Sequence, residues 1–302
     1  MARTAHAVIS LAATAPLVAP ASAQNPQVPP TRYLAVDGGA IAYDDTGGAG
    51  PLVVAIPGMG DLRSEYRLLR PALQKAGYRL VTMDVRGHGE TSAVWDDYSA
   101  RAVGGDALAL IRHLRSGPAV VLGNSFAAGS ALWAAHDDPE QVRGAVLLGP
   151  IVRDGKPSWL ARTALKVGFG GPWRVAFWTT YWNSLFPTRK PSDHAEAKAS
   201  LARMLREPGR MAALQTMVGL SKADTEAMLP LSRVPALVVM GSRDPDFPDA
   251  ALEADWLAQA LKAERLIVEG SGHYPHTEMP ERVVPSLLAF LDRLSAAHSV
   301  AR

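Results

Sequence analysis

One serine stands between small residues directly after an apolar run. Ser125 lies in the segment GNSFA at 123–127, which follows the run 119–122 and precedes a helical pattern. A nucleophilic serine on a strand-to-helix turn has a strained backbone, and small residues two places before and after it avoid collisions with the neighbouring strand and helix. The usual pattern ends in glycine, where this chain has Ala127. The motif alone therefore leaves open a serine that only caps a helix.

A second apolar run ends in carboxylates. The run 236–240 is followed by Asp244 and then by Asp246. A carboxylate placed just past a buried strand could orient a histidine that activates a serine. We expect Asp244 to have this role because it lies nearer the strand end, and Asp246 is the alternative.

A third apolar run ends in histidines. The run 265–268 is followed by His273 and His276. An imidazole could take the proton of Ser125, and the chain order serine, acid, histidine is known for such triads. We expect His273 to be the base because the neighbouring Gly272 leaves room for its ring. We expect His276 to cap or pack against the following helix.

A glycine-rich loop could supply donors for a developing oxyanion. The segment PGMGD at 57–61 follows the apolar run 52–56. Backbone amides aimed at the carbonyl oxygen stabilise the charge that forms when a nucleophile adds to an acyl group. The expected donors are the amides of Met59 and Phe126. An ordinary strand-to-helix loop is the alternative for this segment.

The elements that must position these residues alternate along the chain. Segments 33–36 and 40–43 flank an Asp-Gly-Gly turn and predict a hairpin. Continuous apolar runs then predict buried strands, separated by helical patterns. The strands are expected at 52–56, 79–83, 119–122, 143–148, 236–240 and 265–268, and the helices through 66–73 and at 103–114, 126–136, 252–261 and 282–297. This order predicts an α/β fold with a doubly wound, mostly parallel sheet, whose carboxyl strand ends gather the site.

These motifs together resemble the α/β-hydrolase superfamily, from about Tyr33 to the end of the chain. The segment DVRGHGETS at 84–92 is similar to the superfamily's D-x-R-G-x-G-x-S turn, and His273 is followed by the E-x-P-E element at 278–281. The resemblance implies the α/β-hydrolase fold and a triad of Ser125, Asp244 and His273. It implies no metal or organic cofactor. The related dehalogenases and epoxide hydrolases are disfavoured, because they imply an aspartate nucleophile.

The alternation stops over residues 152–233, which are helical in pattern and broken by Gly and Pro. We interpret this segment as an inserted helical lid between two parts of the core domain, 33–151 and 234–302. Trp178, Tyr181 and Trp182 share one helical face. They could pack the lid onto the core or form an apolar pocket wall.

The N-terminus and the composition bear on compartment and partners. Residues 1–23 combine a positive start, an apolar stretch and an Ala-Ser-Ala site, which predicts a signal peptide, with 24–32 as a flexible tail. We expect a secreted or periplasmic protein, or otherwise a cytoplasmic one. With no cysteine the chain has no disulfide, thiolate metal site or cysteine nucleophile. The formal charge of +2 and the lack of a basic block indicate no nucleic-acid partner, and no apolar stretch is long enough to span a membrane.

The predicted function is hydrolysis of a small to medium hydrophobic carboxylic ester through an acyl-enzyme. Lactonase, amidase and perhydrolase activities use the same triad. Carbon-carbon bond hydrolases share the Gly-Asn-Ser start of the elbow, but they usually have Trp where Tyr274 follows His273. A signal receptor on a hydrolase scaffold is an alternative of another class. The sequence leaves the oligomeric state open.

Overall fold

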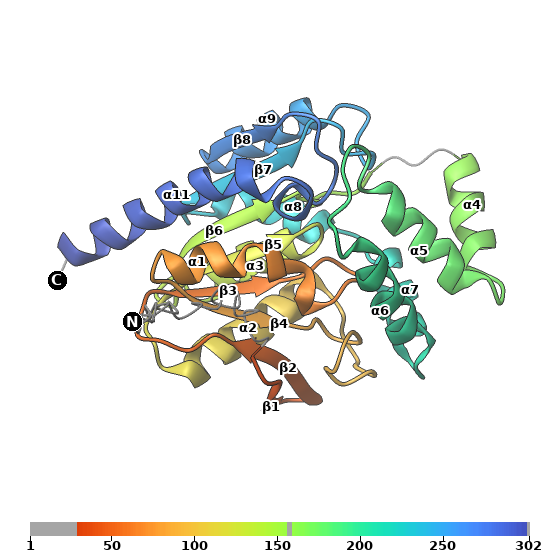
Figure 1. Cartoon of the computed structure of the whole chain (residues 1–302), viewed down its shortest axis with the longest axis horizontal. Coiled ribbons are helices and arrows are strands. Elements are labelled where there is room, and N and C mark those ends of the chain that lie inside the picture. Colours follow the sequence, from red (N-terminus) through yellow and green to blue (C-terminus); the bar gives the residue numbers. More distant parts are fainter. Residues whose placement is uncertain (1–28, 156–158, 301–302) are drawn as a thin grey trace, which may run out of the picture.

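The core of the molecule is one eight-stranded sheet in the order β1-β2-β4-β3-β5-β6-β7-β8 (Figure 1). The computed structural model describes residues 29–155 and 159–300, so the predicted signal peptide at 1–23 and residues 24–28 of the predicted tail lie outside the described residues. The strands are β1 (Arg32–Val36), β2 (Gly39–Asp45), β3 (Leu52–Ile56), β4 (Arg79–Met83), β5 (Ala119–Asn124), β6 (Val142–Leu148), β7 (Ala236–Gly241) and β8 (Glu264–Val268). Among the pairs formed by these described strands, only β1–β2 and β2–β4 are antiparallel. The predicted mostly parallel sheet is confirmed.

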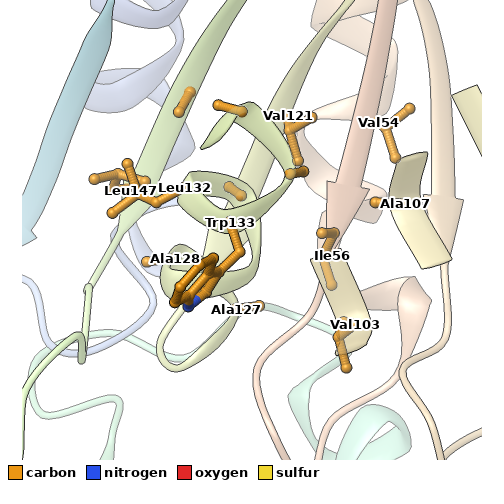
Figure 2. Close-up of a cluster of buried hydrophobic side chains, with 14 of the residues drawn as sticks. Val54, Ile56, Val103, Ala107, Val121, Ala127, Ala128, Leu132, Trp133 and Leu147 are labelled. Carbon is orange, nitrogen blue, oxygen red and sulfur yellow. The ribbon is translucent and has the colours of Figure 1, made fainter. Parts of the chain in front are cut away.

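Helices cover both faces of the sheet. On one face lie α2 (Ala100–Leu114), α3 (Ala127–Asp137) and α9 (Ala250–Leu261); on the other lie the 3₁₀ helix η1 (Arg63–Leu68), α1 (Arg70–Lys75) and α11 (Pro280–Val300). The central strands β3, β5 and β7 are buried at every position, and all five residues of β3 are apolar. Figure 2 shows the side chains of Val54, Val121 and Leu132 in the layer between sheet and helices.

Two differences from the predicted helices have a clear local cause. The helical pattern through 66–73 forms η1 and then a separate helix α1, because Pro71 in the first turn of α1 has no amide hydrogen to continue a helix from before it. Helix α2 starts at Ala100 rather than 103, because the side chain of Ser99 accepts a hydrogen bond from the amide of Ala102 and caps the helix.

Between β6 and β7 the chain is helical, as the pattern of residues 152–233 predicts. The helices are α4 (Trp159–Phe169), α5 (Arg174–Ser184), α6 (His194–Arg206), α7 (Arg210–Gly219) and α8 (Ala223–Met228), followed by the 3₁₀ turn η2 (Leu229–Leu231). Helices α4 to α7 gather at one end of the molecule (Figure 1, green, right). Trp178 and Trp182 are buried there with side chains of α6 and α7, whereas Trp159 and Trp173 are exposed. None of the helices in the described part of the chain is long and apolar enough to cross a lipid bilayer.

Candidate active site

Ser125 occupies a sharp turn between β5 and α3. Its φ is 58°, in the left-handed region that non-glycine residues rarely adopt, and its amide donates to the carbonyl of Leu148 at 2.9 Å. A Cβ atom at Gly123 would lie 2.0 Å from the carbonyl oxygen of Ala127, so only glycine fits there. Ala127 itself is accommodated in the core and fully buried. The turn therefore holds the serine at the carboxyl end of a central strand.

His273 and Asp244 are brought together from two different loops. His273 Nδ1 lies 2.8 Å from Asp244 Oδ2, and both side chains are buried. Asp246 Oδ2 lies farther from the same nitrogen, at 3.5 Å, and the Asp246 amide donates to Asp244 Oδ1. Burial lowers the pKa of His273, but the negative charges of Asp244 and Asp246 outweigh it and raise this pKa to about 9. The direct hydrogen bond is made by Asp244 and the second carboxylate adds charge.

Asp244, Asp246 and His273 could in principle hold a metal ion. They are the one group of acids and histidines among the described residues whose ligand atoms all lie within 4.8 Å of one another. The hydrogen bond between His273 Nδ1 and Asp244 already engages the atoms that would bind the ion. We therefore assign no metal to this group.

Ser125 and His273 open into one pocket of about 510 Å³. Met59, Trp178 and Tyr181 also line it, but Trp182 does not. The expectation that Trp182 forms the pocket wall is therefore not met, because its indole points to the loop after β3 and donates to Asp61 Oδ2. His276 is not a lining residue either. A larger pocket, of about 690 Å³, lies between the α4–α5 and α6–α7 connections and contains none of these groups.

The loop after β3 passes close to the serine turn. A Cβ atom at Gly58 would lie 2.8 Å from Asn124 Oδ1 and 3.3 Å from Ser125 Cβ. Within residues 29–155 and 159–300, no hydrogen bond engages the amide nitrogen of Met59 or Phe126. Both amides are thus available as donors beside the serine.

A buried glutamate links this loop to the histidine loop. Glu65 Oε2 accepts a hydrogen bond from the amide of Gly58 at 3.0 Å, and Glu65 Oε1 lies 2.8 Å from His276 Nε2. Burial raises the pKa of Glu65 to about 8, although the Gly58 amide and the charge of His273 act in the opposite direction. His276, in α10 (Pro275–Glu278), therefore contacts η1, whose Tyr66 ring also stacks on the imidazole; its expected contact with the following helix stays a prediction. Sequence reasoning missed Glu65, because no motif surrounds it.

Helix α5 contacts the loops after β3 and β7 through three aromatic donors on one of its faces. Trp178 Nε1 donates to the carbonyl of Gly60 at 3.2 Å, and Trp182 Nε1 donates to Asp61 at 2.8 Å. Tyr181 lies about one helical turn after Trp178, and its hydroxyl donates to Asp246, at 2.7 and 2.8 Å from the two carboxylate oxygens. The segment between β6 and β7 is therefore attached to the loops on both sides of the serine.

Comparisons with known proteins agree with this arrangement. Residues 53–286 match the model of the alpha/beta hydrolase family. The polyketide synthase ThaQ of Burkholderia thailandensis is 31% identical over 86% of this chain, although the chain spans only 12% of the synthase. The 3-oxoadipate enol-lactonase 2 of Acinetobacter baylyi is 24% identical over 72% of this chain and 80% of the lactonase. A thermophilic esterase from Thermogutta terrifontis has the same fold, with a TM-score of 0.71 and 23% identity over 88% of this chain and 99% of the esterase.

Proposed function

Because the chain belongs to the alpha/beta hydrolase family, we propose that it hydrolyses a carboxylic ester through an acyl-enzyme formed on Ser125. The observation that carries this proposal is the Asp244–His273 hydrogen bond at the edge of the pocket into which Ser125 opens. A carboxylate that holds one imidazole nitrogen leaves the other to act as a base toward the pocket. The mostly apolar lining favours a hydrophobic ester.

The proposed reaction has two halves. The hydroxyl of Ser125 adds to the ester carbonyl while His273 Nε2 takes its proton, and Asp244 stabilises the imidazolium. The amides of Met59 and Phe126 donate to the oxyanion, and the C–O bond breaks as the imidazolium protonates the leaving alcohol. Water, deprotonated by His273, then adds to the acyl-serine ester and forms a second tetrahedral intermediate. Collapse of this intermediate releases the acid and returns the proton to Ser125. The segment between β6 and β7 acts as a lid that limits the access of bulk water.

A p-nitrophenyl ester tests this proposal. We expect a burst of nitrophenolate stoichiometric with enzyme, followed by slower steady turnover, and after acid quenching an acyl adduct on the peptide that contains Ser125. Turnover with the adduct on another residue, or with no covalent adduct when the chemical quench is faster than deacylation, would contradict the mechanism.

A lactone is the second candidate substrate. The enol-lactonase relative, which aligns with 80% of its own length, is named for the opening of a cyclic ester. Opening of a lactone needs the same attack and the same acyl-enzyme, with the alcohol remaining attached to the acyl group. A panel of lactones and linear esters of equal carbon number distinguishes the two by their kcat/KM values.

Glu65 is expected to affect catalysis without touching the substrate. Replacing Glu65 by alanine removes the acceptor that holds the Gly58 amide, so the donor at Met59 moves away from the oxyanion. We expect kcat to fall about 10²-fold, as small displacements of catalytic groups do, with a smaller change in KM. Glu65→Gln keeps an acceptor for Gly58 and should recover most of kcat. Equal losses in the two variants, or a loss seen only in the melting temperature, would show a purely structural role.

A further inference from the structure

One cationic side chain lines the proposed active-site pocket. Lys222, in the connection between α7 and α8, is the single Lys or Arg among the described residues that line the pocket with Ser125 and His273. The remainder of the wall is largely apolar and includes Ile151, Leu165, Phe177, Leu185 and Val218. An ammonium group in such a wall is unusual, because burial of a charge costs free energy unless the charge is paired.

The ammonium of Lys222 lacks a carboxylate partner within the described part of the chain. Its one hydrogen bond with a described residue goes to the carbonyl of Leu220 at 3.2 Å. The nearby Asp154 is occupied otherwise, since its oxygens accept from the backbone amide of Lys222 and the hydroxyl of Ser221. Because an ammonium has three donors, two remain for a ligand. Burial lowers the pKa of Lys222, and the charge of Asp154 opposes that shift.

Lys222 lies on the side of the pocket that carries the proposed oxyanion donors. Met59, Ile151 and Lys222 line both this pocket and a small adjoining one of about 20 Å³, which Phe126 also lines. The small pocket has room for about one water molecule, so the larger pocket must hold the substrate. The negative charge in the wall, Asp246, lies beside His273 instead, and both its oxygens accept from Tyr181.

We propose that Lys222 binds a carboxylate on the substrate, so that the enzyme acts on half-esters or lactones of dicarboxylic acids. This inference rests on the proposed function and narrows its substrate class. A carboxylate would supply the acceptor that the two unused donors lack, and such charge-assisted hydrogen bonds are stronger than neutral ones. The apolar wall would contact the methylene chain between the carboxylate and the scissile ester.

Matched substrates test the charge directly. The p-nitrophenyl half-esters of four- to seven-carbon diacids are compared with the corresponding esters whose far carboxylate is replaced by a neutral carboxamide. We expect wild-type kcat/KM to favour the carboxylate at the best chain length by about tenfold or more, mainly through KM. Lys222→Met should lower this carboxylate-to-carboxamide ratio by about the same factor. Lys75→Met, which removes the same charge from the exposed end of α1, should keep the wild-type ratio.

A binding measurement separates this inference from the proposed function. The half-amides of the same diacids contain no ester, so they should raise the melting temperature of the wild type and not that of Lys222→Met, whether or not any ester is hydrolysed. A wild-type ratio near one, or a ratio that Lys222→Met leaves unchanged, would overturn the role of Lys222. The absence of ester turnover together with a Lys222-dependent shift would overturn the hydrolysis proposal alone.

Discussion

Ser125→Ala is expected to lower kcat for ester hydrolysis by about 10⁶-fold, the loss typical when the nucleophile of a serine triad is removed. Alanine has no oxygen to form the acyl-enzyme, so the remaining rate comes from binding and from the oxyanion donors. The burst of nitrophenolate should disappear with the steady rate. Rapid-quench kinetics on wild type and variant measure both.

The matched control for this variant is Ser130→Ala. Ser130 lies on α3, the helix that follows the turn of Ser125; it is fully buried, and its hydroxyl has no hydrogen-bond partner among the described residues. Its replacement should leave kcat near the wild-type value, because no polar contact of the site is lost. A Ser125→Ala variant that retains turnover within about tenfold of wild type would remove Ser125 from the mechanism, given the loss expected for a nucleophile.

Asp244→Asn is expected to lower kcat by about 10⁴-fold. An asparagine amide facing Nδ1 can favour the wrong tautomer of His273 and cannot balance the charge of the imidazolium. Asp246→Asn should cost far less, because Asp246 lies 3.5 Å from Nδ1 whereas Asp244 lies at 2.8 Å. Steady-state kinetics of the two variants compare the two candidate acids. If the large loss followed Asp246→Asn instead, the assignment of the acid would have to be reversed.

The pH dependence of kcat/KM tests whether Asp246 influences the base. Only neutral His273 can accept a proton, and its pKa is raised to about 9 by Asp244 and Asp246 despite burial. The rise of kcat/KM with pH should therefore have an apparent pKa above the ordinary histidine value of about 6.5. The negative charge of Asp246 stabilises the protonated ring of His273. Because Asp246→Asn removes this charge, the rise of kcat/KM should move to lower pH. An unchanged profile would show that Asp246 does not influence the base.

The sequence was sufficient for the sheet because its parallel strands contain continuous apolar runs, such as 52–56 in β3 and 236–240 in β7. The residues that follow β5, β7 and β8 could be placed together from topology alone, since parallel strands end at a common edge. That argument put Asp244 next to His273, as the structure shows. Residues far apart in the sequence could be placed together when each of them directly follows a strand.

Contacts made away from strand ends could not be predicted in this way. Glu65 and His276 are 211 residues apart, and neither lies in a periodic pattern that points to the other. Helical periodicity put Trp182 on the same face as Trp178 and Tyr181. Trp178 and Tyr181 line the pocket and Trp182 does not. This difference depends on the angle at which α5 crosses the loops, which is set by the packing of α5 with α6 and α7.

The three aromatic donors of α5 limit how substrate can enter. To swing outward as a rigid body, α5 would have to release Gly60, Asp61 and Asp246 in one step, and the loops on both sides of the nucleophile would lose their support with it. Ala164 and Leu165 belong to α4, which also borders the pocket, and both are exposed. An entrance on the α4 side would leave the hydrogen bonds of α5, and with them the loops that carry the catalytic groups, unchanged.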